Sequence, residues 1–442
     1  MNTNTLLSFA SVMKSVGGVL LAVVILLVMV TVHEFGHYVA GKILGFKINE
    51  FSVGFGPAIL KKRSKKTGEL FALRIIPLGG YCAFDGEDDY EDENGEDGAK
   101  NGEADTPFAE TLEEKPIETA AGQTPVVATV ENAANEGGMY EPTEKTAEKK
   151  EEYPEPKGAR FNDQPPWKRI IVLIAGATMN YILAVFLIIL MFASVGRPVY
   201  KVVVENPNPE AATAQTASVE QTSDALEEAA TGGLMTGDVI LQIDGKHVYM
   251  ITDYMDALEG KKKGDSVPVT VLREGKRQTA YMVLAANGDF ANMSDTNTLL
   301  KAMNIYGLYT VTEKQGFFPT IGHSFAYSVK IGGTVLRSLG ELLTGKLGLR
   351  AMGGPVTTIK ITSEAAASGL LSFLNIAAFI GVNLAVFNLL PIPALDGCKV
   401  IFCIIEWIRK KPVNRKVETI IHFVGIVFLF GFAILVDLLQ LF

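Results

Sequence analysis

The sequence contains very little cysteine, and this scarcity excludes a disulfide-stabilised fold. Only three cysteines, Cys82, Cys398 and Cys403, occur among 442 residues, and they provide no disulfide framework. No C-x-x-C pair is present either, so the spacing gives no support to a cysteine metal site. We interpret the three cysteines as small buried hydrophobic residues.

Charged residues are missing from four long stretches, which cover Ser15–Val32, Ile170–Gly196, Ala365–Leu395 and Thr419–Val436. About 20 apolar residues cross the hydrocarbon core of a bilayer at 1.5 Å per residue. The first stretch resembles a signal peptide, but no small-x-small cleavage site follows it. The alternative, core helices of a large soluble domain, would require all four runs to be buried in one chain. The sequence therefore predicts a multi-pass α-helical membrane protein with about four transmembrane helices.

Basic residues are concentrated in the two connections that follow the first and third apolar stretches. These connections contain Lys61, Lys62, Arg63, Lys65 and Lys66, and Arg409, Lys410, Lys411, Arg415 and Lys416, respectively. Lys and Arg near helix ends favour the cytoplasmic side. Both connections are therefore predicted to be cytoplasmic, and both termini and residues 197–364 are predicted to lie outside.

Acidic residues are concentrated in one segment of the chain. The formal net charge is −9, but residues 82–166 contain 24 Asp and Glu against 7 Lys and Arg, which leaves +8 for the remainder. The segment has few large apolar residues, so it cannot bury enough surface to offset its ordering entropy. We predict an acidic disordered insert at 85–165, with disorder from about Glu87 to Asp163.

Two further regions carry β patterns. Residues 46–84 alternate in a strand-like way between glycines, which predicts a small sheet of hairpins at the cytoplasmic face. In the outer segment, Gly232–Val248 and Val267–Leu284 contain strands with Asp-Gly and Glu-Gly turns. A generic small β domain is one interpretation of this module. The better match is a PDZ domain, which the module resembles at Gly237, Asp238, Ile240, Asp244 and Gly245.

The first apolar run ends in His33-Glu34-Phe35-Gly36-His37, an H-E-x-x-H motif. Positions i and i+4 share one face of a helix, so His33 and His37 can hold one metal ion beside Glu34. The plainer alternative is a set of satisfied polar residues in a helix bundle. An ionisable cluster continuous with a membrane helix is costly and usually functional, which favours the metal site.

A catalytic zinc site needs a third protein ligand besides the two histidines. His247 and His323 are predicted to lie outside, whereas His422 lies near the start of the fourth apolar stretch. Asp396 is the better candidate because it is the only charged residue between Glu364 and Lys399. It follows a segment that Pro391 and Pro393 interrupt, and freed backbone at membrane depth is tolerated only against protein or a wet cavity.

These residues closely resemble the site-2 protease family of intramembrane zinc metalloproteases, in the bacterial form that carries a PDZ domain. The H-E-F-G-H motif and the N-x-x-P-x-P-x-L-D-G motif from Asn388 to Gly397 both occur, in the expected order. Supporting matches are Phe51–Gly56, Pro77–Tyr81, Ala175–Asn180 and Gly353–Pro355.

The resemblance implies one Zn²⁺ per chain, with His33, His37 and Asp396 as ligands, Glu34 as general base, and Asn383 and Asn388 holding substrate. It implies a multi-pass protein of the bacterial plasma membrane, with the active site near the cytoplasmic side and the PDZ-like domain outside. The implied substrates are pre-trimmed single-span membrane proteins such as anti-sigma factors or remnant signal peptides. A peptide ligand of the PDZ-like domain is a further expected partner, and nucleic acid is not.

The alternative function is a catalytically inactive, membrane-anchored PDZ adaptor with a structural metal site, which would have four protein ligands. The predicted organisation is 1–45 first transmembrane helix, 46–84 β region, 85–165 insert, 166–196 second transmembrane helix, 197–290 PDZ-like domain, 291–364 linker and surface amphipathic helix, 365–398 third transmembrane segment, 399–416 cytoplasmic loop and 417–442 fourth transmembrane helix.

Overall fold

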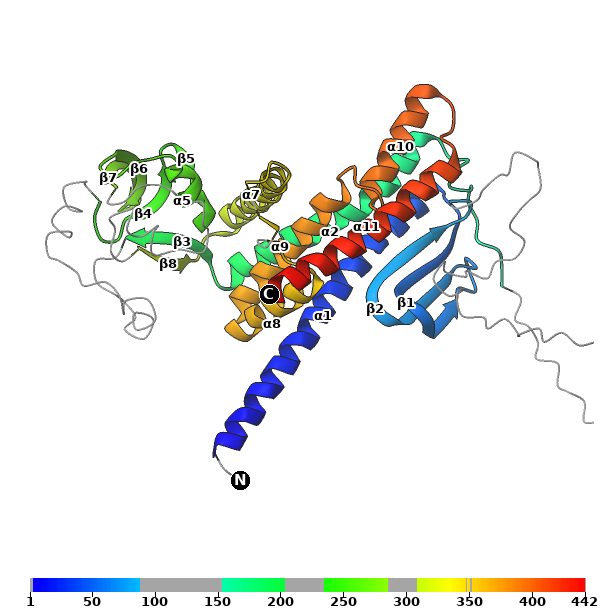
Figure 1. Ribbon diagram of the computed structural model, residues 1–442, viewed down its shortest axis with the longest axis horizontal. Helices are drawn as coiled ribbons and strands as arrows, with labels where there is room; N and C mark the ends of the chain where they lie inside the picture. The colour runs from blue at the N-terminus through cyan, green and yellow to red at the C-terminus, as the bar shows by residue number, and fades with distance from the viewer. Residues whose placement is uncertain are drawn as a thin grey trace, which may run out of the picture.

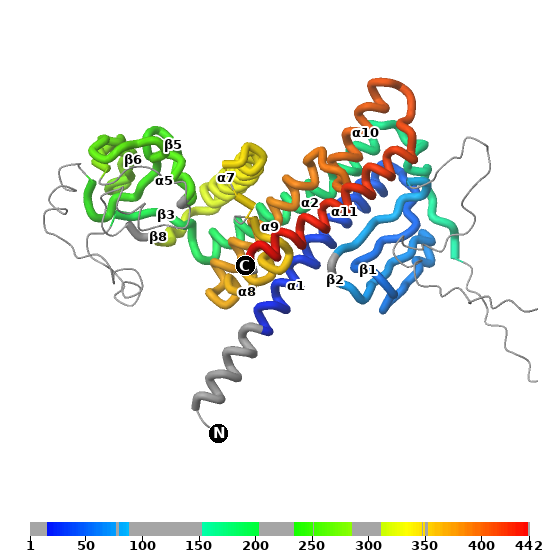
Figure 2. The backbone as a smooth tube through the Cα atoms, in the orientation of Figure 1, coloured from blue at the N-terminus to red at the C-terminus, as the bar shows by residue number. Residues whose placement is uncertain are grey.

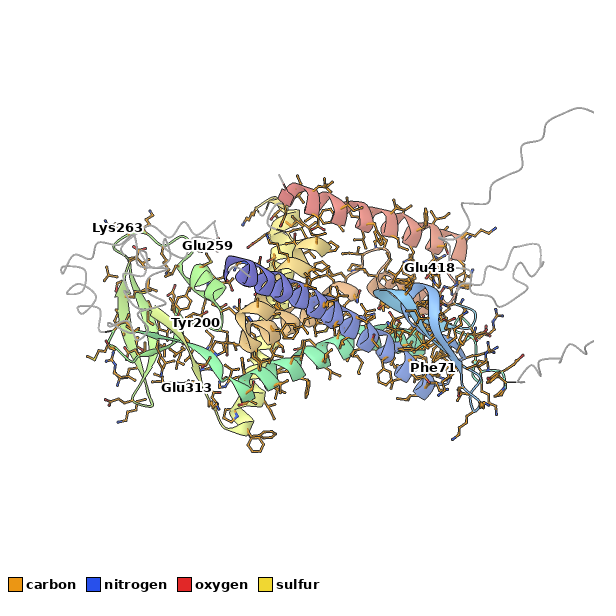
Figure 3. The ribbon with its side chains drawn as sticks, turned by 90° about the horizontal axis from the view of Figure 1, so that it is seen from below. Phe71, Tyr200, Glu259, Lys263, Glu313 and Glu418 are labelled. Atoms are coloured by element: carbon orange, nitrogen blue, oxygen red, sulfur yellow. The ribbon has the colours of Figure 1, made fainter. Side chains whose placement is uncertain are left out.

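The computed structural model describes residues 3–87, 153–202, 234–284, 308–346, 348–349 and 352–441. A group of long helices occupies the middle of the molecule, with a small sheet at one end and a larger β module at the other (Figure 1). A second view keeps this order, with Phe71 and Glu418 at one end and Tyr200, Glu259, Lys263 and Glu313 at the other (Figure 3). The helices are α1 (Thr3–Leu44), α2 (Pro166–Ser194), α5 (Ile251–Leu258), α7 (Phe317–Leu343), α8 (Pro355–Ser368), α9 (Leu370–Asn388), α10 (Asp396–Arg409) and α11 (Arg415–Leu441).

Four of these helices are long and apolar enough to span a membrane. The candidate spans are Val16–Leu44, Pro166–Ser194, Leu370–Asn388 and Arg415–Gln440. Each overlaps one predicted charge-free stretch, so the expectation of a multi-pass membrane protein is confirmed. Apolar residues from α2, α7 and α9 pack together in the largest helical cluster, which includes Ile188, Tyr327 and Val382.

The third apolar stretch is not one continuous helix. Gly369 separates α8 from α9 with a φ of 120°, a backbone conformation that residues with a side chain rarely adopt. After α9 ends at Asn388, a turn containing Pro391 and Pro393 leads into α10 at Asp396. The prolines cannot donate the backbone hydrogen bonds that would continue the helix.

A two-stranded sheet packs beside the C-terminal end of α1. Its long strands, β1 (Ile48–Arg63) and β2 (Leu70–Phe84), are antiparallel, and Phe51 pairs with both Cys82 and Phe71. The first part of β1 therefore lies between the two ends of β2, which requires the strands to bend strongly. Residues 80–84 of β2 form one edge of the sheet. Buried Phe46, Ile48 and Phe84 join it to α2 and α10 in one apolar cluster.

The larger module is built on a six-stranded antiparallel sheet with the order β7-β6-β4-β3-β8, in which β5 pairs with β4. Asp244-Gly245 and Glu274-Gly275 form the two predicted turns, with all four φ values positive, as type I′ hairpins require. Its chain ends connect to α2 and α7, so both connections lead back to the helices (Figure 2). The strands are β3 (Arg197–Val202), β4 (Val239–Ile243), β5 (Lys246–His247), β6 (Ser266–Arg273), β7 (Lys276–Val283) and β8 (Leu308–Glu313).

Helix α7 forms where a surface helix was predicted, with small polar residues among its buried side chains and large apolar residues on its exposed face. Thr320, Ser324 and Ser328 are buried against its neighbours, whereas large apolar side chains such as Phe318 and Phe325 are exposed. An exposed apolar face of this kind suits contact with lipid.

The predicted disordered insert extends too far at its C-terminal end. Residues 88–152 lie outside the described part of the chain, but Tyr153–Asp163 is described. Phe161 is only 4% exposed and packs against Phe46 and Phe84. The expectation of disorder up to Asp163 is therefore wrong, because a single buried aromatic residue is invisible in the average composition of an acidic segment.

Phe161→Ala should lower the stability of the protein by about 3 kcal/mol, because truncating a buried Phe leaves a cavity. Thermal unfolding of the full chain in detergent would measure the change. Phe318→Ala is the matched control, because Phe318 is 81% exposed and its truncation leaves no internal cavity. Equal melting temperatures for the two variants would contradict the packing role of Phe161.

Candidate metal centre

Three side chains from two helices converge on one point inside the molecule. His33 and His37 come from α1, and Asp396 is the first residue of α10. Asp396 Oδ2 lies 3.0 Å from His33 Nε2 and 3.3 Å from His37 Nε2, and the two Nε2 atoms are 3.1 Å apart. The structure thus brings together the three residues that the sequence singled out as metal ligands.

The spacing of these atoms fits a zinc ion. Zinc bonds of about 2.05 Å at tetrahedral angles place ligand atoms about 3.3 Å apart, close to the three observed separations. All three potential ligand atoms lie within 4.8 Å of one another. Two imidazole nitrogens and a carboxylate oxygen are also a donor set that zinc prefers.

Helix α2 determines which nitrogen of His37 faces the centre. His37 Nδ1 donates a hydrogen bond to the carbonyl oxygen of Val172, with the atoms 2.8 Å apart. With the proton on Nδ1, Nε2 keeps the lone pair that a metal ligand needs. The carbonyl is therefore an outer-shell partner of the centre.

His33 is flanked by two asparagine amides. Asn180 Nδ2 from α2 and Asn388 Nδ2 at the end of α9 each lie 3.4 Å from His33 Nδ1. Rotating either amide by 180° brings its oxygen to this nitrogen, where it can accept the Nδ1 proton. Asn180 Oδ1 is buried without a hydrogen-bond partner, so rotation would give this oxygen a partner. Val172, Gly176 and Asn180 form one face of α2 beneath the two histidines.

Glycine at position 176 makes room for the histidine rings. A Cβ added to Gly176 would overlap His37 Nε2 and would lie 2.8 Å from His33 Cε1. A second glycine, Gly36 on α1, faces the carbonyl group of Ala175 equally closely. The two helices can therefore cross closely enough for α2 to support both imidazoles.

Gly176→Ala should weaken zinc binding by roughly 10- to 100-fold, the usual cost of disturbing an outer shell. The added methyl group would push the imidazoles away from Asp396 while leaving all three ligands in place. Competition with a zinc chelator would measure the affinity. Gly333→Ala is the matched control, since a Cβ at Gly333 meets nothing within 4 Å, and identical affinities for the two variants would contradict this account.

Glu34 lies beside the cluster without belonging to it. The three clustered atoms come from His33, His37 and Asp396, and Glu34 is half-buried on the neighbouring position of α1. A Cβ built on Gly80 of β2 would lie 3.3 Å from Glu34 Cγ. The edge of the small sheet therefore passes directly beside this carboxylate.

The remaining predicted residues divide into two groups. Asn388 is next to His33, as described above, whereas Asn383 lies half-buried on α9 and makes no side-chain hydrogen bond to the cluster. His422, the alternative third ligand, is outside the cluster, and its Nδ1 accepts a hydrogen bond from the backbone N–H of Ala394. The sequence does not directly indicate the Val172 carbonyl or Asn180 as partners of the histidines. The spacing of Gly176 and Asn180 by four residues is nevertheless a signal for a shared helix face.

The cysteines take no part in the centre. All three are free and buried, which confirms their interpretation as small core residues. Burial raises the pKa of the Cys82 thiol well above its ordinary value, and nearby Glu34 adds to the shift. This thiol therefore stays protonated at neutral pH.

A separate cavity of about 350 Å³ lies between the larger sheet, α2 and α7. Arg197, Gln242, Thr270 and His323 are among its lining residues. None of the clustered side chains lines it, so the candidate centre is distinct from this cavity.

Comparison with known proteins gives matches over nearly the whole chain. The family described as Peptidase family M50 matches residues 21–432. The Regulator of sigma-W protease RasP of Bacillus subtilis (strain 168) is 29% identical over 434 residues, which cover 94% of this chain and 96% of that protein. The Zinc metalloprotease RasP of Geobacillus kaustophilus (strain HTA426) is 26% identical over 412 residues, with 90% and 91% covered. The Putative zinc metalloprotease Atu1380 of Agrobacterium fabrum is 27% identical over 420 residues, with 92% and 91% covered.

Proposed function

The chain belongs to peptidase family M50, and from this premise we propose that it is an intramembrane zinc protease with one metal ion per chain. His33, His37 and Asp396 would hold the ion, and Glu34 would act as general base. The observation that carries the proposal is the convergence of the three potential ligand atoms, two of which come from a helix that also qualifies as a membrane span. Relatives named zinc metalloprotease support the choice of metal.

Three protein ligands support catalysis over a structural role. A structural zinc site is closed by four protein ligands, whereas a catalytic site leaves one position open. Within the described residues, the group contains two histidines and one aspartate only. This composition favours the protease over an inactive adaptor.

The chemistry divides between the metal and the side chains around it. A bound zinc ion would supply a Lewis acid for the scissile carbonyl and would lower the pKa of water to about 7. Glu34 accepts the proton of the attacking water and delivers it to the leaving amine nitrogen. Val172 and the flanking asparagines keep the two imidazoles in the orientation that exposes Nε2.

A transmembrane substrate must unwind before its peptide bonds can be attacked, because a helix uses its carbonyls internally. Residues 80–84 of β2 could hold the unwound substrate, because they form a sheet edge and the described pairings of β2 are all with β1. An extended substrate can add to this edge as a strand, next to Glu34. Asn383 and Asn388 would then satisfy backbone groups that the strand leaves unpaired.

The positions of the two sheets support the proposed orientation in the membrane. The β1–β2 sheet packs at the start of α2, and the larger module follows the end of α2 (Figure 1). If α2 spans the bilayer, the two sheets lie on opposite sides. The basic residues of the β region support a cytoplasmic position for it, which would put the PDZ-like module outside.

This arrangement and the name of one relative support a proposal for the substrate class. The B. subtilis relative is named a regulator of sigma-W protease, which supports a substrate that controls a sigma factor, such as a single-span anti-sigma factor. Remnant signal peptides are the second class of substrate that we propose. In the proposed orientation, the PDZ-like module would lie on the outer side of the membrane, where a bulky substrate ectodomain would also lie. We expect it to admit substrates that another protease has already shortened.

Cleavage by the purified full chain in zinc-containing vesicles would test the proposed function. Two versions of one single-span substrate, with a short and with a bulky outer domain, provide the comparison. The expected result is cleavage of the short version within its membrane segment and little cleavage of the bulky one. Failure to cleave either version, with zinc bound at one ion per chain, would overturn the proposal.

A further inference from the structure

The turn that precedes Asp396 contains a strained residue. Ala394 has a φ of 77°, a left-handed conformation that costs a residue with a Cβ roughly 1 kcal/mol or more. The turn is also tightly packed, because a Cβ on Gly397 would lie 2.5 Å from the carbonyl carbon of Leu389. Something outside the turn must stabilise this conformation, since glycine is absent from position 394.

Helix α11 supplies the missing support. The backbone N–H of Ala394 donates to His422 Nδ1, with the atoms 3.0 Å apart. Three residues further along the same face of α11, a Cβ on Gly425 would lie 2.7 Å from the carbonyl carbon of Pro393. Helix α11 therefore lies directly on the turn, and His422 bonds the one residue of the turn that is strained.

The imidazole of His422 is itself well oriented. The ring of Phe402, on α10, packs against it in an edge-to-face arrangement with the centroids 5.9 Å apart. Because Nδ1 accepts a hydrogen bond, a neutral ring carries its proton on Nε2. His422 is thus occupied as a hydrogen-bond acceptor and is unavailable as the third ligand.

We infer that His422 is a positioning residue for the metal centre: it stabilises the left-handed turn at Ala394 and so places the Asp396 carboxylate against His33 and His37. The inference rests on the proposed role of Asp396 as a ligand. It also means that α11 helps to form the metal centre, although only 11% of the apolar part of this helix is buried. Any displacement of α11 from the turn would release Ala394 and move a ligand.

Variants of His422 separate this role from simple packing. His422→Ala should weaken zinc binding by roughly 10- to 100-fold, as expected for an outer-shell partner, and should lower kcat at saturating zinc with little change in KM. His422→Asn should restore most of both, because Asn Oδ1 accepts a hydrogen bond at the position of Nδ1. His422→Gln should not, because its acceptor lies further along the side chain.

A second variant tests the strain directly. Ala394→Gly removes the conformational cost of the positive φ, so it should restore part of the zinc affinity of His422→Ala while leaving the parent nearly unchanged. Zinc affinity would be measured by chelator competition on the full chain in detergent, and hydrogen exchange at Ala394 would report the bond without metal. Wild-type affinity in His422→Ala, or equal losses in the Ala and Asn variants without rescue by Ala394→Gly, would overturn the inference.

The outcomes also distinguish this inference from the proposed function. A parent protein that binds zinc without cleaving substrate would contradict the protease assignment, while the affinity series would still test His422. A parent that cleaves normally beside an unaffected His422→Ala variant would refute only the positioning role.

Discussion

Glu34→Gln should abolish peptide-bond cleavage while leaving zinc content near one ion per chain. The substitution keeps the size of the side chain but removes its capacity to accept a proton, and loss of a general base costs roughly 10²- to 10⁴-fold. Because Glu34 lies beside the three clustered atoms and not among them, the ligand set remains intact. Product formation in vesicles and metal analysis of the same sample would measure both effects.

The matched control for this substitution is Glu364→Gln. Glu364 is an exposed glutamate on α8, so its neutralisation should change neither activity nor zinc content. In cells that carry Glu34→Gln, shortened single-span remnants should accumulate in the membrane relative to the parent. Undiminished cleavage by the purified variant would refute the catalytic assignment of Glu34.

Asp396→Ala should empty the zinc site. The carboxylate supplies one of three ligand atoms and lies within 3.3 Å of both imidazoles, so its loss should exceed the roughly 10- to 100-fold effect of an outer-shell change. We expect near-zero zinc after dialysis and no cleavage. Metal analysis before and after dialysis would measure the loss.

Glu364→Ala provides the control for Asp396→Ala, because it removes an exposed carboxylate from α8. Its zinc content should equal that of the parent. Full zinc occupancy in Asp396→Ala would show that another residue completes the site and would contradict the assignment of Asp396 as a ligand.

The three proposed metal ligands could be singled out from the sequence because their signals are local or rare. His33 and His37 stand four residues apart on one helix face, and Asp396 is the only charged residue in a long apolar region. The four membrane segments were predictable for the same reason, since an apolar stretch of about 18 or more residues without charge is rare outside membrane helices.

The outer shell could not be predicted in the same way. Val172 contributes through its backbone carbonyl, which leaves no signature in the side-chain sequence. Gly176 matters only because α1 and α2 cross at that point, and the bond between His422 and Ala394 joins residues 28 positions apart on different elements. Phe161 was missed because its contacts with Phe46 and Phe84 are long-range. Each of these depends on tertiary packing.

The face of α2 that lies against His33 and His37 is near the start of that helix. This depth would determine the lengths of the two cleavage products. Gly176 is ten residues after Pro166, the start of the helix, or about 15 Å along its axis. A substrate cut at that depth keeps only about ten membrane residues on the side of the β1–β2 sheet, half of what a stable span requires. That fragment would no longer be anchored and would leave the bilayer, while the longer remainder would stay in the lipid.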